Sequence, residues 1–390
     1  MMSTQPARIY LDYNATHPLL PTAQQAMLDV ADVWGNPSSL HAEGRLARGV
    51  IERARTDVAA LIGGDRYGVV FTSGGTESDQ LGILGLAHVA VAAGRPKVVA
   101  TTAIEHPAVA GAVDYLREAG WRVRLLPVDG GGVVRAEGLA QAFVEGIGVC
   151  AISVVNHELG TMQPVVAMAQ QLRASGAFIH VDAVQAAGRL ALAPLAAVVD
   201  SLAISGHKIG GPKGVGALWL NAGRPGVDQA LPLLHAGHQE RGRRPGTENT
   251  MAIAGFAAAA RTAVAGVARW SAVTELGDVL ERALRTIPDV AIHGADALRV
   301  GGTINVGFAG ARGESIVMAL DVAGVAASTG AACTSGSVKP SAVLLGIGLD
   351  PAAARSAVRF SLGHATTAMD IAQVAAQLPP IVLRARMQRP

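Results

Sequence analysis

The stretch Asp200-Ser-Leu-Ala-Ile-Ser205-Gly-His-Lys208 places a lysine just after a short apolar run. The run predicts a buried strand, and an open α/β sheet puts its binding sites at the carboxyl ends of such strands. Lysine is rare in this chain, where only positions 97, 208, 213 and 339 carry it among 32 basic residues. Its amine forms a Schiff base with an aldehyde cofactor, which a guanidinium cannot do. Lys208 is therefore a candidate cofactor lysine, and a solvated loop lysine is the alternative.

Strand-like and helical segments alternate along the first two-thirds of the chain. This alternation predicts an α/β fold, with a mostly parallel sheet flanked by helices on both faces. The expected strands are 68–72, 97–101, 121–126, 148–154, 177–181, 200–205 and 214–220, and the helical segments between them include 76–93, 106–119, 136–145 and 164–174.

The pattern changes near Thr247, where two long helical stretches precede a smaller α+β region with strands near 303–308 and 356–361. A chain of 390 residues is long enough for two hydrophobic cores. We expect a large domain of residues 21–260 and a small domain made of residues 1–20 and 261–390.

Composition excludes several classes of protein. The net charge is +2 and no basic tract is present, so direct nucleic-acid binding is not expected. The first eight residues contain no apolar segment typical of a secretory signal. The apolar stretch 251–268 is interrupted by Arg261, which predicts a packed helix and no membrane span. Two cysteines without a Cys-x-x-Cys spacing favour neither a disulfide framework nor a metal site. We expect a cytoplasmic enzyme.

A candidate anion site follows the expected strand 68–72. Ser73-Gly-Gly-Thr-Glu-Ser78 leads directly into a helical segment. Small residues at a helix N-terminus leave backbone N–H groups free for an anion, and Thr76 adds a hydroxyl. An ordinary helix start with Glu77 in its first turn is the alternative. No G-x-G-x-x-G or Walker lysine is present here, so a dinucleotide or nucleoside triphosphate fits poorly.

Asp182 lies at the end of the expected strand 177–181, 26 residues before Lys208. A carboxylate there could pair with a protonated pyridine nitrogen, which makes pyridoxal phosphate a strong electron sink. Taken alone, Asp182 could equally cap a helix. Together with Thr76 and Lys208 it supplies a phosphate site, a pyridinium partner and a Schiff-base lysine at three strand ends. This combination is far more specific than any one of its members.

Two further residues are candidates for the chemistry. Cys333 lies in Ala331-Ala-Cys-Thr-Ser-Gly-Ser337, whose small polar residues predict an accessible loop suited to a nucleophile. Cys150, by contrast, lies in an apolar run and is expected to be a core residue. Arg359 could clamp a substrate carboxylate bidentately, although a surface ion pair is the simpler interpretation of that residue alone.

With these residues in order, the chain resembles cysteine desulfurases of the NifS/IscS-like group. That group belongs to the class V aminotransferase family of fold-type I pyridoxal-phosphate enzymes. The resemblance extends over nearly the whole length, and the number of motifs in the right order makes a chance match very unlikely. The matching motifs are 10–16, 35–39, 73–78, 105–106, 180–183, 205–208, 239–247, the Cys333 loop and 359–363.

The resemblance implies a role for each matching position. Lys208 would bind pyridoxal 5'-phosphate as a Schiff base, and His106 would stack on its ring and assist proton transfers. Cys333 would attack the sulfur of L-cysteine, leaving alanine and a persulfide. The other positions would bind the cofactor ring (Asp182 at its nitrogen, Gln185 at its phenolic oxygen), its phosphate (Gly75, Thr76, Ser205, His207, and Thr247 from the second subunit of a homodimer) and the substrate (Asn36, and Arg359 at the carboxylate).

Some positions depart from the family pattern. His157 stands where the family usually has a cofactor-contacting Asn, and it could still donate a hydrogen bond to the phenolic oxygen. His17 replaces a usual Thr and Gln80 a usual Asn. The long form of the Cys333 loop resembles the group that hands sulfur to a protein acceptor, either an iron–sulfur scaffold or a thiolation carrier as in tRNA thiolation.

Two other functions stay open at this point. One is a different reaction on the same scaffold, such as transamination or selenocysteine lysis. Transamination needs no Cys333, so Cys333→Ala would leave it intact. The other is a weakly catalytic partner in a sulfur-transfer complex, for which His157 is the one hint in the sequence.

Overall fold

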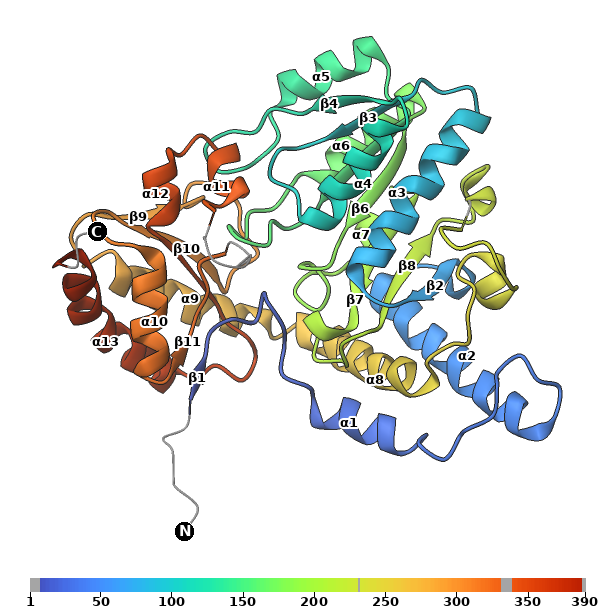
Figure 1. The fold of residues 1–390 in the computed structure, drawn as a ribbon, viewed down its shortest axis with the longest axis horizontal. Coiled ribbons are helices and arrows are strands. Elements are labelled where there is room, and N and C mark those ends of the chain that lie inside the picture. The colour runs from blue at the N-terminus through green and yellow to red at the C-terminus, as the bar shows by residue number, and fades with distance from the viewer. Residues whose placement is uncertain (1–7, 231, 331–338, 388–390) are drawn as a thin grey trace.

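The structure is a computed structural model that describes residues 8–230, 232–330 and 339–387. Its larger part is built on a seven-stranded sheet (Figure 1). The strands β4, β3, β5, β6 and β7 are parallel to one another, whereas β8 is antiparallel to both of its neighbours, β7 and β2. In spatial order the strands are β2 (Val69–Thr72), β8 (Gly216–Leu220), β7 (Ser201–Ser205), β6 (Phe178–Asp182), β5 (Val149–Ser153), β3 (Val98–Thr101) and β4 (Arg122–Leu125).

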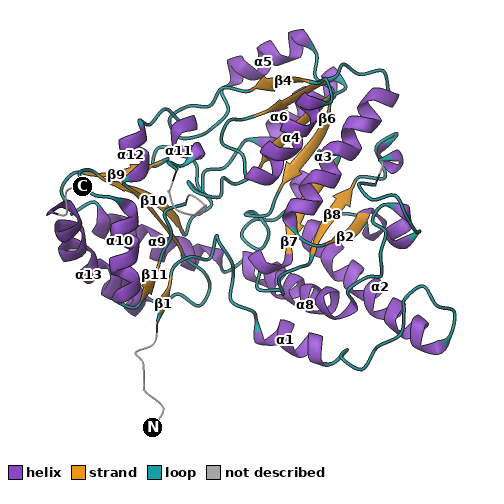
Figure 2. Cartoon of the chain, viewed as in Figure 1, coloured by secondary structure: helices purple, strands orange, loops and turns teal. Residues whose placement is uncertain are grey.

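Helices cover both faces of this sheet (Figure 2). Neighbouring residues of β5 show why, because side chains alternate across a strand. Val149 and Ala151 pack into one core, whereas Cys150 and Ile152 pack into the other. The first core is shared with α3 (Gly75–Ala92) and α4 (Pro107–Glu118), and the second with α2 (Ala42–Ile62), α6 (Val165–Ser175) and α8 (Thr250–Val267). The elements α1 (Pro21–Leu28), α5 (Ala136–Glu145) and α7 (Ala193–Ala196) complete this part of the fold.

The smaller part has its own core around an antiparallel sheet in the order β12 (Ala357–Ser361), β10 (Thr303–Phe308) and β9 (Val290–His293). The N-terminal segment joins it, because β1 (Ile9–Tyr10) pairs in parallel with β11 (Val325–Ala326). Ile9 and Leu11 are buried in the same core. The helices of this part are α9 (Trp270–Leu284), α10 (Gly313–Val322), α11 (Ala342–Gly346), α12 (Pro351–Arg355) and α13 (Ala368–Met387).

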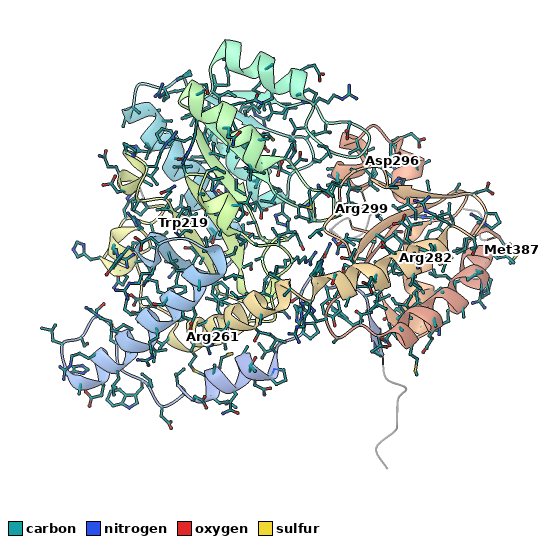
Figure 3. All side chains as sticks on the ribbon, turned by 180° about the vertical axis from the view of Figure 1, so that it is seen from behind. Trp219, Arg261, Arg282, Asp296, Arg299 and Met387 are labelled. Carbon is teal, nitrogen blue, oxygen red and sulfur yellow. The ribbon has the colours of Figure 1, made fainter. Side chains whose placement is uncertain are left out.

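The helix α8 connects the two parts. Within the described residues it is the one helix long and apolar enough to cross a membrane, but it packs against α1 and α2 and much of its surface is buried. Ala263 still belongs to the core of the large sheet, whereas Trp270 belongs to the small core. In Figure 3 Arg261 accordingly lies on the side of the large part, and Arg282, Asp296 and Arg299 lie on the side of the small part. The proposed domain boundary at residue 260 stays a proposal. Along this helical region, the buried residues pass from the large core at Ala263 to the small core at Trp270.

Candidate active site

A cavity of about 730 Å³ lies where the carboxyl ends of β3, β5, β6 and β7 face the small part of the molecule. Parallel neighbours end at one edge of a sheet, so side chains far apart in sequence meet there. His106, Asp182, Lys208 and Arg359 all line this cavity, although 253 residues separate the first from the last. The remaining predicted residues that line it are Gly75, Thr76, His157, Gln185, Ser205 and His207.

Lys208 ends a single 3₁₀ turn (Gly206–Lys208) that directly follows β7. Its Nζ donates hydrogen bonds to the backbone carbonyl oxygens of Asn14 at 2.5 Å and Ala15 at 2.8 Å. Burial, with added repulsion from the Arg359 and Arg189 guanidinium groups, lowers the pKa of the Lys208 amine to about 8. A substantial fraction of this amine is therefore neutral, and hence nucleophilic, at mildly alkaline pH.

Asp182 is the last residue of β6, and its carboxylate is buried at the cavity floor. Its Oδ1 accepts a hydrogen bond from the backbone N–H of Val184 at 2.8 Å. Burial raises the pKa of this carboxyl, and the nearby His106 and Lys208 act in the opposite direction. The carboxylate also interacts with the Ser153 side chain, and it lines the cavity.

His106 occupies the cap position before α4, and its Nδ1 accepts a hydrogen bond from the Ala108 N–H at 3.1 Å. Burial lowers the pKa of His106, which keeps the ring neutral, and an accepting Nδ1 requires the proton to sit on Nε2. The ring of His157 stands edge-on to it with centroids 5.2 Å apart. Burial lowers the pKa of His157 well below its usual value, so this ring is neutral as well.

The expected anion site is at the N-terminus of α3. Gly75 is the first residue of that helix, and a Cβ there would lie 2.9 Å from Val184 Cγ2. Ser205 Oγ is buried beside it without a hydrogen-bond partner, although hydroxyls buried to this degree are normally paired. His207 Nδ1 lies 3.1 Å from Thr16 Oγ1, and burial lowers the pKa of His207 to about 4. The expected anion site thus combines neutral side chains, Ser205 and His207, with the backbone N–H groups at the start of α3.

Arg359 is an interior residue of β12 with 5 % of its surface exposed, so the surface ion pair considered from sequence is wrong. Its Nη2 lies 2.7 Å from Asp12 Oδ1 and its Nη1 donates to the carbonyl of His157 at 3.0 Å. Nε is buried without a partner. The guanidinium is thereby fixed in one orientation at the wall of the cavity.

Several residues at this site were not singled out from the sequence. The backbone oxygen of Asn14 accepts from both Lys208 and Gln185 Nε2, while its Oδ1 accepts from Arg189. Glu105 Oε2 accepts from the N–H of Ser153 at 2.9 Å and from its hydroxyl, and burial raises the pKa of Glu105 to about 7. Both residues stand in the quoted motifs 10–16 and 105–106, but no local pattern gives their long-range partners.

A buried pair of one histidine and one aspartate, His180 and Asp79, lies next to the cavity. Asp79 lines the cavity, and its Oδ1 lies 3.1 Å from His180 Nε2. His180 Nδ1 in turn lies 2.8 Å from Ser201 Oγ. Burial lowers the pKa of His180 to about 3 and raises that of Asp79 well above its usual value. The helical spacing of 76–93 shows Asp79 only as a polar residue on a core-facing helix, so the sequence held no signal for this contact.

Two of the predicted residues that the structure describes do not line the cavity of their own chain. Asn36 is exposed before α2, where its Oδ1 accepts from the Ser38 N–H. Thr247 lines a separate hollow of about 210 Å³ beside Ser73 and Arg244. Cys333 lies outside the described residues. The described residues on either side of its segment do line the cavity, namely Ser328 and Gly330 before it and Lys339 and Ser341 after it.

The residues present fit pyridoxal phosphate. The unpartnered Ser205 hydroxyl and the open Gly75 backbone suit the phosphate, and the buried Asp182 carboxylate suits a pyridinium. Gln185 Oε1 is a further buried atom without a partner. Lys208 supplies the amine at the centre of this group.

The comparison with known proteins agrees with this chemistry. The model of the family "Aminotransferase class-V" matches residues 9–374, so the chain belongs to that family. A cysteine desulfurase from Cereibacter sphaeroides is 41 % identical over 387 residues, covering 98 % of each chain. The cysteine desulfurase NifS of Azotobacter vinelandii is 39 % identical over 388 residues, covering 98 % of this chain and 95 % of the relative. A solved NifS-like protein superimposes with a TM-score of 0.88 at 31 % identity, covering 97 % and 100 %.

Within that family, the chain is a pyridoxal-phosphate-dependent cysteine desulfurase, since relatives with this activity match it along nearly its whole length. The α/β architecture with its mostly parallel sheet confirms the predicted fold class.

Proposed function

We propose that the cavity around Lys208 binds pyridoxal phosphate and L-cysteine, and that Cys333 receives the substrate sulfur as a persulfide. The convergence of Lys208, Asp182, His106 and Arg359 on one cavity carries this proposal. Each supplies a different requirement: an amine for the aldehyde, a carboxylate for the ring nitrogen, a neutral imidazole above the ring and a cation for the substrate carboxylate. A transaminase would need all four of these groups but not Cys333.

The bound cofactor supplies an electron sink for the carbon skeleton of the substrate. The chain supplies the groups that hold and move protons, His106 and Lys208. His106 Nδ1 is engaged by the Ala108 N–H, so its Nε2 is the atom that can hold a proton at the ring. A Lys208 amine that is not bonded to the cofactor would be able to carry protons near pH 8, because its pKa is lowered to about 8.

Arg359 holds the substrate by its carboxylate. The ion pair with Asp12 and the bond to the His157 carbonyl fix the guanidinium, so little side-chain entropy remains to be lost on binding. Asn36 is proposed as a second substrate contact and Thr247 as a phosphate contact, both delivered by the second subunit of a homodimer. Their positions away from the cavity of their own chain support this arrangement.

The sulfur step requires a thiolate on Cys333. That sulfur bonds to the sulfur of the substrate while the substrate's Cβ–S bond breaks. The electron pair of the broken bond stays with the carbon skeleton, which takes up protons and leaves as L-alanine. Sulfur in the persulfide then passes to a protein acceptor, which we propose to be an iron–sulfur scaffold or a thiolation carrier in the cytoplasm.

Alanine formation from L-cysteine, measured with a reductant and without a keto acid, tests the function. We expect alanine and sulfide in matching amounts with the unmodified chain, and neither with Cys333→Ala. Alanine formation that persists in Cys333→Ala would contradict the persulfide step. Loss of the cofactor absorbance band in Lys208→Ala, but not in Lys213→Ala, tests the cofactor assignment separately.

A further inference from the structure

A second cavity, of about 290 Å³, lies on the other side of Lys208. It is lined by the N-terminal segment, the segment after β6 that carries Arg189, the 3₁₀ turn after β7, the helices α8 and α9, and the segment after β12. Lys208 is the one residue that lines both this cavity and the cofactor cavity. The lining residues used below are Tyr13, His17, Arg189, Arg269, Trp270 and His364.

The charged side chains that line this second cavity are all basic among the described residues. Arg189, Arg269 and Lys208 line it, and within the described part of the chain no Asp or Glu side chain does. A surface of this protein would normally mix both signs, because 30 acidic residues accompany 32 basic ones. The cavity therefore has a positive potential that a bound anion would neutralise.

Among the basic residues that line the second cavity, Arg189 gives the strongest indication of an anion site. It is 7 % exposed, and burial together with the Arg359 charge lowers its pKa to about 10. Among the described residues its guanidinium makes one hydrogen bond, from Nη2 to Asn14 Oδ1 at 2.8 Å, and no ion pair. Buried arginines are almost always paired with an anion. A buried guanidinium that faces a cavity without a carboxylate partner is a ready site for one.

The walls are flat and apolar. The guanidinium of Arg189 stacks on Trp270 at 5.2 Å from the ring centroid, and Trp270 Nε1 is occupied by the Val300 carbonyl at 2.8 Å. Tyr13 and His17 stand edge-on to one another 5.0 Å apart, as do Trp270 and His364 at 5.3 Å. Burial lowers the pKa of both histidines, so they are neutral and present ring surface and N–H groups.

We propose that this second cavity binds a small organic anion with a flat apolar body, the chemistry of an aromatic carboxylate. Its carboxylate lies against Arg189, with Arg269 at the exposed mouth, and its ring lies between Tyr13 and Trp270. The volume is close to the lower limit for ligand pockets, about 300 Å³, which suits a single-ring ligand. This site does not depend on the proposed function, because among the described residues Lys208 is the one proposed cofactor or substrate residue that lines it.

Calorimetric titration of the cofactor-loaded protein with benzoate tests the site, with benzamide as the neutral control. We expect benzoate to bind at least about tenfold more tightly than benzamide, because a charge-assisted bidentate pair is lost with the amide. Arg269→Gln should weaken benzoate and leave benzamide unchanged.

Two matched substitutions decide which cavity is occupied. Ala365→Trp fills the mouth of the second cavity, whereas Ala342→Trp places the same side chain at the mouth of the cofactor cavity. Both alanines are exposed, so both variants should fold. Loss of benzoate binding in Ala365→Trp alone supports the proposal. Loss in Ala342→Trp alone, equal binding of benzamide, or no binding to the unmodified protein would each overturn it.

Discussion

Arg55 and Glu240 form a buried two-pronged ion pair in which Nη1 and Nη2 each lie 2.7 Å from a carboxylate oxygen. The two side chains are 4 % and 1 % exposed. Glu240 Oε2 also accepts the backbone N–H of Phe71 in β2, and Arg55 Nη1 donates to the Val69 carbonyl. The pair therefore ties the segment that carries Thr247 to the large sheet, although Glu240 itself has a left-handed φ of 47°.

Glu240→Gln should lower the free energy of unfolding by about 3–5 kcal/mol, because it leaves the buried Arg55 charge with only the more exposed Glu52 carboxylate as an ionic partner. Urea denaturation followed by circular dichroism measures this change. The matched control is Asp57→Asn, which breaks the more exposed pair with Arg261 and should cost less than about 1 kcal/mol. Equal losses in the two variants would contradict the role given to burial.

The two cysteines should differ sharply in reactivity. Cys150 is fully buried in β5, and burial raises the pKa of its thiol to about 12. Iodoacetamide at pH 8 should therefore label one thiol per native chain, at Cys333, as read by mass spectrometry of peptides. Cys150→Ala should keep the same label, and Cys333→Ala should lose it. Rapid native labelling of Cys150 would show that β5 opens readily.

Glu105 should make stability depend on pH. Burial raises its pKa from 4.5 to about 7, so the folded state binds more protons than the unfolded state between these values. The free energy of unfolding therefore falls as pH rises through this window. Glu105→Gln should flatten the dependence between pH 5 and 7 in urea titrations, whereas Glu275→Gln on the exposed side of α9 should retain it. An unchanged slope in Glu105→Gln would assign the dependence to Asp79 or Asp182, whose carboxyls are also buried with raised pKa values.

Mixed dimers test whether Thr247 serves the partner's cofactor site. If the protein forms the proposed homodimer, Lys208→Ala and Thr247→Glu each damage both of its sites, the second by placing a negative charge against the phosphate. If Thr247 acts across the interface, a mixed dimer concentrates both defects in one site and leaves the other site intact. Re-associating the two inactive variants should therefore restore alanine formation, up to about a quarter of the unmodified rate for random pairing. If Thr247 served its own chain, mixing would restore nothing.

Most strands of the large sheet were predictable because they are short apolar runs bounded by turn residues. The expected segment 303–308 is observed as β10 with the same bounds, and 148–154 is observed as β5 over Val149–Ser153. The antiparallel direction of β8 was not predictable, since an apolar run has the same composition in either direction. The β1–β11 pair was also missed, because two-residue strands have no periodicity.

The candidate site divides in the same way. The sequence by itself determined the residue types at the strand ends, so Lys208, Asp182 and Thr76 were predicted from their place after apolar runs. Only the tertiary structure decided that Asp12 pairs with Arg359 and that Asn14 accepts a hydrogen bond from Lys208. It also decided that Arg189 faces a cavity that no carboxylate of the described residues lines. A sequence pattern reports side-chain periodicity over a few neighbouring residues, so it predicts strands and helices but not distant contacts. These contacts join positions more than 170 residues apart, and they exist only because packing of the two cores closes the chain around them.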